Sequence, residues 1–336
     1  MFGEMIGVWI FHELANTGYK GKWNLIELGP GRAQLMSDVL RSLQKFQDED
    51  VSVHLVETSD SLIKEQERVL CVDNSTPPSG TEKYVRKNKS KTGVDIYWYK
   101  NIDDLPDGFS VFIGNEFLDA LPIHQFTRKE DGTWREIYLN LNKQQELCFM
   151  ESKGENLHTR GLIPPSIRED KQRRTWECSP EAGTAITQIV DRIVTFGGFG
   201  LLVDYGHDGS RNTHSLRAYK SHKQVDPLSN PGGVDITADV DFGYLKTLVQ
   251  DKTVVCGPVN QRDFLSQLGI EYRLRRLLKS TEDRQQQENV IKAYNMLMGD
   301  MGEKFKAFSL FPKTLQTILD ARGGPAGFTE VKKEDQ

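Results

Sequence analysis

The chain of 336 residues carries 43 Lys and Arg against 48 Asp and Glu, so its formal net charge is -5. This length suits one large α/β domain or two smaller ones and excludes a mini-domain. The acidic balance argues against a nucleic-acid partner, because phosphate binding needs a basic face. Its apolar runs all fall short of the roughly 20 residues of a membrane helix, so we expect no stable membrane insertion.

Strand and helix patterns alternate along the first third of the chain. Apolar spacing predicts a widely buried helix over residues 2–16, which begins at the first residue without an N-cap. The segments after it read as strand 23–28, helix 32–46, strand 51–57, helix 59–69, and strands 94–100 and 110–114. Such alternation predicts a mostly parallel sheet with helices on both faces.

The rest of the chain adds antiparallel and helical insertions to this α/β pattern. We interpret the polar stretch 73–92 as an exposed loop and expect three hairpin-like strands within 123–150. Further elements are expected at helix 180–196, strand 199–205, helices 240–250, 261–268 and 281–298, and strand 306–311. The prediction is a single domain over 1–319, with its core at 20–125 and 176–260, an insertion near 126–175, a helical part at 261–311 and a disordered tail at 320–336.

A glycine-rich turn, ELGPGRA (27–33), joins a predicted strand to a helix. Gly29 and Gly31 allow a tight turn and a close approach of the backbone to a ligand. Glu57 ends the next strand, where a Rossmann-type site holds a carboxylate against ribose hydroxyls. Gln34 breaks the GxGxxG pattern of dinucleotide sites. With Glu27 before the glycines, the pattern resembles the first motif of class I S-adenosylmethionine (SAM) methyltransferases, and a bare glycine turn is the alternative.

Asn115, Glu116 and Asp119 cluster after another predicted strand, at the edge where ligands bind in open α/β sheets. The same residues also suit a helix start, with Asn115 as its cap and the acids in the first turn. Spacing does not decide between these two interpretations.

A third strand end carries Asp204, His207 and Asp208. Since no histidine pair there has tight ligand spacing, structural or substrate-contact roles are favoured and no metal site is expected.

Motifs in order along nearly the whole chain carry a family resemblance. They are FGEMIG (2–7), ELGPGRA (27–33), NEFLDALP (115–122), DYGH (204–207), LRAY (216–219), DITADVDF (235–242) and MGEKFKAF (301–308). The series resembles the MidA family of mitochondrial protein arginine methyltransferases, which assist assembly of respiratory complex I. The resemblance implies a class I methyltransferase fold, SAM as cofactor, a matrix location, and symmetric dimethylation of an arginine in a core complex I subunit.

Site roles follow from the resemblance combined with the chemistry of the acceptor. Glu27, Gly29, Gly31 and Glu57 should bind SAM, and Asn115 should line the methyl-transfer site and border the cofactor. A guanidinium has a pKa above 12 and its nitrogens are poor nucleophiles, so carboxylates that orient it would help transfer. Glu116 is the expected carboxylate, with Asp119 or Asp204 in support.

Two departures from the family pattern leave alternatives open. Ala33 replaces the usual last glycine of the loop, which is expected to perturb rather than abolish binding. Family members carry a transit peptide and a further segment before the FGE motif, so the sequence resembles an N-terminally truncated form. The alternatives are a catalytically impaired isoform that acts as a non-catalytic assembly factor and, with less support, a NAD(P)-binding oxidoreductase.

Overall fold

The computed structural model describes residues 1–46, 50–72, 80–221 and 223–329, and the chain divides into two compact units. Unit 1 contains residues 1–117, 186–204 and 249–336, and unit 2 contains 118–185 and 205–248. The sequence predicted one domain with an insertion at 126–175, whereas a second segment, 205–248, clusters with that insertion in unit 2. Among the described residues, no helix is long and apolar enough to cross a bilayer.

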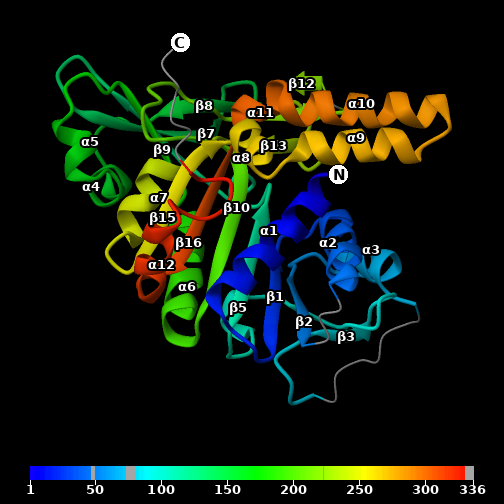
Figure 1. The fold of residues 1–336 in the computed structure, drawn as a ribbon. Helices are drawn as coiled ribbons and strands as arrows, with labels where there is room; N and C mark the ends of the chain where they lie inside the picture. Colours follow the sequence, from blue (N-terminus) through cyan, green and yellow to red (C-terminus); the bar gives the residue numbers. More distant parts are fainter. Residues whose placement is uncertain (47–49, 73–79, 222, 330–336) are drawn as a thin grey trace, which may run out of the picture. The chain divides into compact units, whose positions relative to one another are not determined.

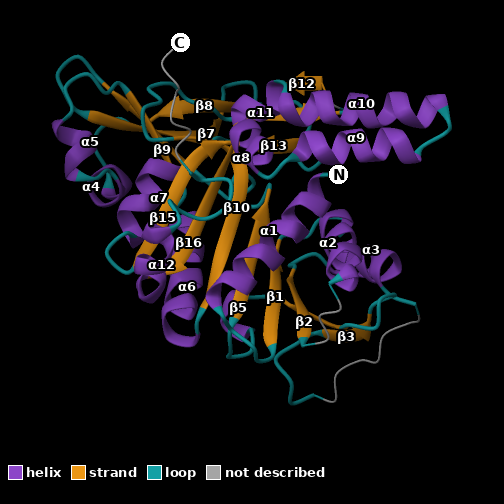
Figure 2. Ribbon diagram, in the orientation of Figure 1, coloured by secondary structure: helices purple, strands orange, loops and turns teal. Residues whose placement is uncertain are grey.

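Unit 1 is built on a mostly parallel sheet of the order β3-β4-β2-β1-β5-β10-β16-β15 (Figure 1, Figure 2). Strand β1 pairs in parallel with both β2 and β5, and β5 pairs in parallel with β10. The strands at the two edges pair antiparallel, β3 with β4 and β15 with β16. The bounds are β1 Trp23–Leu28, β2 Val51–Val56, β3 Arg86–Lys89, β4 Asp95–Tyr99, β5 Ser110–Asn115, β10 Gly198–His207, β15 Thr253–Asn260 and β16 Phe305–Pro312.

The helices around this sheet agree with most of the sequence-based segments. The helices wholly in unit 1 are α1 Phe2–Thr17, α2 Gln34–Lys45, α3 Asp60–Leu70, α8 Gln261–Gln267, α9 Ile270–Ser280, α10 Arg284–Met298, α11 Asp300–Lys304 and α12 Gln316–Ala321. Helix α6 (Pro180–Phe196) continues into unit 1 from unit 2, and Ser179 caps it by accepting the Ala182 N–H at 3.1 Å. The sequence did not predict helices α9, α11 and α12 or strand β15.

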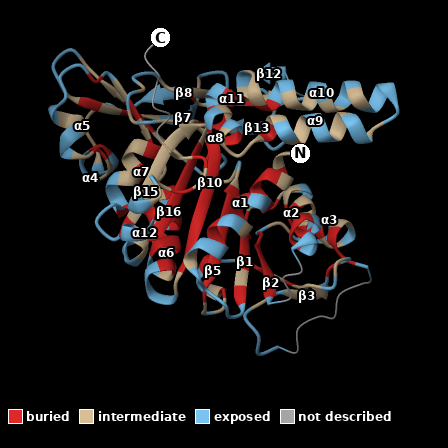
Figure 3. Cartoon of the chain, viewed as in Figure 1, coloured by how far each residue is buried: buried red, intermediate tan, exposed pale blue. Residues whose placement is uncertain are grey.

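Helices cover both faces of the unit 1 sheet, as the strand and helix alternation predicted. Phe199 and Gly200 are consecutive in β10, so their Cα–Cβ directions point to opposite faces. The Phe199 ring packs edge-on against Trp9 of α1, with 5.5 Å between ring centroids. A Cβ placed on Gly200 would instead lie 3.7 Å from Ile193 of α6. Helices α1 and α6 therefore lie on opposite faces, and strands β5 and β10 between them are buried (Figure 3).

Helix α1 is buried as its apolar spacing predicted, and the C-terminal segment covers it. Trp9 has no exposed surface, and its indole N–H donates to the Ala326 carbonyl at 2.9 Å. The fully buried Glu13 accepts the Ala326 N–H at 2.8 Å and pairs with Arg322. We expected a disordered tail from Asp320, but residues 320–329 are ordered in the structure, because α1 offers them a charged partner and apolar surface. Residues 330–336 of the expected tail lie outside the described residues.

The basic run that was interpreted as an exposed loop includes a short edge strand, β3. Arg86 of β3 pairs with Glu67 of α3, and Asn88 donates to the same carboxylate. Charged side chains are a common way to protect an edge strand from further pairing, which explains why the run looked like a loop. The part of that expectation that covers residues 73–79 lies outside the described residues.

Unit 2 contains a four-stranded antiparallel sheet of the order β8-β7-β6-β9 and a three-stranded sheet of the order β12-β11-β13. The first sheet contains the three predicted hairpin strands plus β9, and the second was not predicted. The strands are β6 His124–Arg128, β7 Trp134–Leu141, β8 Leu147–Glu151, β9 Thr175–Cys178, β11 Arg217–Lys220, β12 Lys223–Val225 and β13 Asp235–Thr237. Strand β14 (Val240–Asp241) pairs with the end of β10, and the helices are α4 Leu157–Leu162, α5 Pro165–Glu169 and most of α7 Phe242–Val249.

Replacing Glu13 by Ala tests whether the C-terminal segment depends on the buried charge in α1. The change leaves the Arg322 guanidinium without its buried partner, so we expect the free energy of unfolding in urea to fall by about 3 kcal/mol. Glu65→Ala, which removes an exposed pair with Arg68 on α3, is the matched control and should leave the unfolding midpoint unchanged. Equal midpoints for the two variants would contradict this account.

Candidate functional site

The order of the unit 1 strands reverses beside β1. From β1 the chain continues outward through β2 and β4, then returns to add β5 and β10 on the other side of β1. In open α/β sheets such a reversal marks where ligands bind, outside the carboxyl ends of the strands. Glu27, near the end of β1, is paired in register with Ile113 of β5, two residues before Asn115. The reversal thus brings the glycine turn and the end of β5 to one edge.

Glu27 is the most unusual group at this edge. Its side chain is only 3% exposed, and its Oε2 has no hydrogen-bond partner among the described residues. Burial raises the pKa of the Glu27 carboxyl to about 8, because the ionised form loses its hydration without a compensating charge. A buried, unpaired carboxylate costs free energy, and such groups concentrate at functional sites. A cationic ligand group would supply the missing partner.

The glycine turn after β1 has the conformation that its sequence requires. Gly29 and Gly31 have φ of +60° and +52°, in the left-handed region. A Cβ on Gly29 would approach the Phe117 ring to 3.0 Å, whereas one on Gly31 would meet no atom within 4 Å. Ala33 is also left-handed, with φ of +58°, which costs an L residue about 1 kcal/mol. Ala33, which stands where the family pattern has glycine, therefore has the left-handed backbone conformation that glycine adopts more easily.

Gln66 on α3 connects the glycine turn to the acid after β2, and sequence reasoning missed it. Its fully buried side-chain amide donates to the Gly31 carbonyl at 2.8 Å and to Glu57 Oε2 at 3.0 Å. The amide oxygen of Gln66 accepts the Trp98 indole N–H at 3.0 Å, which fixes its orientation. Glu57 also accepts the Ser59 N–H at 2.8 Å. The only sequence signal for Gln66 was a polar residue on the buried face of a helix.

Asn115 and Glu116 lie at the end of β5, and the structure favours a turn over a helix start. Glu116 has φ of +51°, its N–H donates to the Val203 carbonyl at 3.1 Å, and its side chain is exposed. A left-handed, non-glycine residue at a strand end is a feature that clusters at ligand sites. Asp204, the supporting acid, lies in β10 with no exposed surface.

Asp119 belongs to unit 2, where it joins two of the sequence motifs. Its carboxylate accepts the Thr237 hydroxyl at 2.8 Å, and its carbonyl accepts the Ala238 N–H at 3.1 Å. Asp239 of the same segment pairs with Arg217. The motifs NEFLDALP, LRAY and DITADVDF thus share a polar network in which Asp119 is 6% exposed.

His207 and Asp208, at the end of β10, form hydrogen bonds within the turn that follows this strand. His207 Nδ1 accepts the Gly209 N–H at 3.0 Å, and Asp208 accepts the Ser210 N–H at 3.1 Å. Burial lowers the pKa of His207, which favours the neutral ring. These contacts are structural, one of the two kinds of role, structural or substrate-contact, that sequence analysis favoured.

Comparison with known proteins identifies the family. A family model described as "Putative S-adenosyl-L-methionine-dependent methyltransferase" matches residues 5–259. The curated mitochondrial protein arginine methyltransferase NDUFAF7 homolog of Caenorhabditis elegans is 71% identical, over 99% of this chain and 78% of that protein. The mitochondrial protein arginine methyltransferase NDUFAF7 of Danio rerio is 39% identical over 99% and 81%, and that of Homo sapiens 36% over 93% and 71%.

Solved structures share the fold at low sequence identity. An uncharacterized protein from Burkholderia thailandensis aligns with a TM-score of 0.75 at 20% identity, over 99% of this chain and 83% of that one. A second structure from the same organism, of a likely methyl transferase bound to S-adenosyl-homocysteine, aligns with a TM-score of 0.72 at 20% identity, over 92% of this chain and 76% of that one. The chain therefore has the class I methyltransferase fold, its cofactor is SAM, and it belongs to the MidA-like family of SAM-dependent methyltransferases.

Proposed function

We propose that this methyltransferase acts on protein arginine, methylating an arginine of a core subunit of mitochondrial complex I and thereby promoting complex I assembly. The names of the curated relatives support arginine as acceptor and the mitochondrion as location. The observation that carries the proposal is the buried Glu27 carboxylate beside the glycine turn, at the point where the strand order reverses. The matrix location and the symmetric dimethylated product are parts of the same proposal.

Unit 1 offers complementary groups to each end of SAM. Glu27 would accept the ammonium of the methionine part, which supplies the charge that its buried carboxylate lacks. Gly29 and Gly31 would let the backbone approach the ligand, since neither carries a side chain. Glu57 would accept the ribose hydroxyls, because each of its oxygens keeps a lone pair beyond the hydrogen bonds from Ser59 and Gln66. When bound, SAM supplies an electrophilic methyl group on a sulfonium.

The acceptor side of the proposal rests on the end of β5. Glu116 presents an exposed carboxylate there and would hold the guanidinium through paired charge-assisted hydrogen bonds. Asn115 would line the path of the methyl group. Correct placement of nitrogen and methyl contributes up to about 7–11 kcal/mol to such a transfer, so positioning is the main task of these side chains. Asp119 would hold the segment that follows Glu116 in place through its hydrogen bonds with Thr237 and Ala238.

Mass spectrometry tests the proposed substrate. Core complex I subunits from cells with and without the protein should differ by methylation at one arginine, and the purified protein with SAM should restore the modification. Equal arginine methylation in both cell lines would overturn the substrate assignment while leaving SAM binding unaffected.

Glu27→Gln should separate ligand binding from stability. Removing the carboxylate should weaken SAM binding at least about tenfold in calorimetry, because the ammonium loses its charged partner. The free energy of unfolding should rise by up to about 3 kcal/mol at pH 7. Glu27 has a folded pKa of about 8 against 4.5 for the unfolded chain, so its destabilising effect grows as pH rises from 4.5 toward 8. At pH 4.5 the gain should disappear.

The control is Glu65→Gln on α3, which removes an exposed carboxylate of the same unit and should alter neither quantity. A Glu27→Gln variant that binds SAM as tightly as the parent protein would refute the ammonium assignment.

The Gln66→Met variant tests whether Gln66 positions the groups that would bind SAM. The variant loses the bonds to Gly31 and Glu57, so we expect the KM for SAM to rise at least about fivefold while the KM for the acceptor stays unchanged. Gln188→Met is the control, because Gln188 makes an exposed hydrogen bond to Asp103 elsewhere in unit 1. A purely structural role would raise both KM values or neither.

Glu116→Gln should block transfer without preventing SAM binding. The amide cannot hold a guanidinium with two charge-assisted bonds, so kcat should fall by about 100-fold or more. Calorimetry should give an unchanged affinity for SAM. Glu130→Gln, at an exposed turn of unit 2, should retain full activity. Normal methylation by Glu116→Gln would remove this residue from the proposed mechanism.

A further inference from the structure

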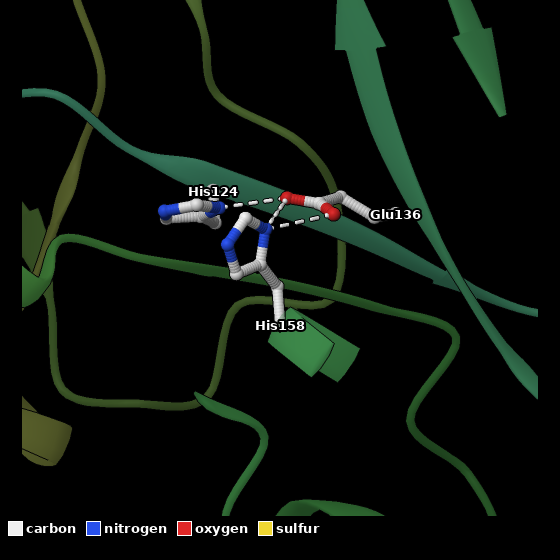
Figure 4. Close-up of side chains that lie close together, drawn as sticks. All are labelled: His124, Glu136 and His158. Carbon is white, nitrogen blue, oxygen red and sulfur yellow. Dashed lines mark hydrogen bonds and ion pairs between the residues drawn. The ribbon is translucent and has the colours of Figure 1, made fainter. Parts of the chain in front are cut away.

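A second cluster of chemically active side chains lies entirely within unit 2. His124 is the first residue of β6, Glu136 lies in the adjacent strand β7, and His158 is the second residue of α4 (Figure 4). Phe126 is paired in register with Glu136, and His124 lies two residues before Phe126 on the same face of β6. The strand pairing therefore brings His124 diagonally opposite Glu136, and α4 adds His158 beside them.

The three side chains converge through their polar atoms. His124 Nδ1 lies 2.7 Å from Glu136 Oε1, and His158 Nδ1 lies 2.8 Å from the same oxygen and 3.0 Å from Oε2. One potential ligand atom from each residue falls within 4.8 Å of those of the other two. Figure 4 shows both imidazole rings presenting Nδ1 to one carboxylate. We propose that His124, Glu136 and His158 form a zinc site.

The donor set favours zinc over the hard divalent cations. Two imidazole nitrogens and one carboxylate oxygen are ligands that Zn²⁺ accepts, whereas Mg²⁺ and Ca²⁺ prefer oxygen alone. Tetrahedral ligands at about 2.0–2.1 Å from zinc lie about 3.4 Å from one another. The N···O separations of 2.7–3.0 Å are a few tenths of an ångström shorter, so side-chain rotation makes room for the ion.

A neighbouring side chain orients the Glu136 carboxylate. Asn156 Nδ2 donates to Glu136 Oε2, and the Asn156 side chain also caps α4 by accepting the Thr159 N–H at 2.9 Å. This residue therefore orients both the carboxylate and the helix that carries His158, as residues outside the ligand set commonly do around metals.

The three side chains of the cluster differ in how much of their surface is exposed to solvent. The Glu136 side chain is 10% exposed, that of His124 29% and that of His158 54%. An ion can therefore enter from the His158 side, and a water molecule can complete the coordination. Coordination through Nδ1 requires that the proton of each ring lie on Nε2, so on binding the proton would move from Nδ1 to Nε2 through solvent and each ring would stay neutral. The ion would then tie β6, β7 and α4 together.

Zinc titration of the full chain tests the site. After chelator treatment, calorimetry should show one equivalent of Zn²⁺ bound, and Co²⁺ in its place should give the visible absorption of a tetrahedral nitrogen and oxygen site. Zinc should also raise the thermal unfolding midpoint. Because His158 is half exposed, His158→Gln should fold and bind Zn²⁺ at least about tenfold more weakly. Glu136→Gln should lose binding as well.

His12→Gln, which removes an exposed histidine of α1 in unit 1, should bind zinc as the parent protein does. The absence of stoichiometric binding would overturn the proposal and leave the cluster as a hydrogen-bonded group. Binding that persists in His158→Gln, or a cobalt spectrum dominated by thiolate, would overturn it too, because the ion would then be held elsewhere.

Discussion

The buried carboxylate of Glu27 is the constraint around which unit 1 is arranged. The central position of β1 between β2 and β5 removes this side chain from water, and no described residue forms a hydrogen bond with its Oε2. A chain selected for stability alone would place an apolar residue there, since an uncompensated acid opposes folding at neutral pH. The retained acid makes sense when the missing charge comes from a bound ligand, and the family's cofactor carries an ammonium.

Direct contacts link several of the residues that we propose to bind the cofactor. The glycine turn follows β1 directly, and the Gln66 amide ties that turn to Glu57 through one side chain. Phe117, which follows Glu116, fills the space left by the absent side chain of Gly29. A change in any of these positions would therefore be transmitted to the others by direct contact.

The sequence motifs have different surroundings in the two units. In unit 1, the ELGPGRA and NEFLDALP motifs begin at the ends of β1 and β5, at the edge where open α/β sheets bind ligands. In unit 2, Asp119 accepts the Thr237 hydroxyl and Arg217 pairs with Asp239, so these motif residues have structural contacts of their own. His124, Glu136 and His158 are separated by 12 and 22 positions in the sequence, without a recognised ligand spacing. The pairing of β6 with β7 brings the first two together, and α4 adds the third.

The alternation of strands and helices, the glycine turn and the acids at the strand ends could be predicted before the structure was known, because these features depend on local periodicity and backbone freedom. The sequence also indicated the family through motifs read in order. Tertiary structure alone decided which acid lost its hydration, that Gln66 joins Gly31 to Glu57, that residues 320–329 pack on Glu13 and Trp9, and that two histidines share one carboxylate. Each of these depends on contacts between residues far apart in the chain, and local sequence does not record which surfaces meet.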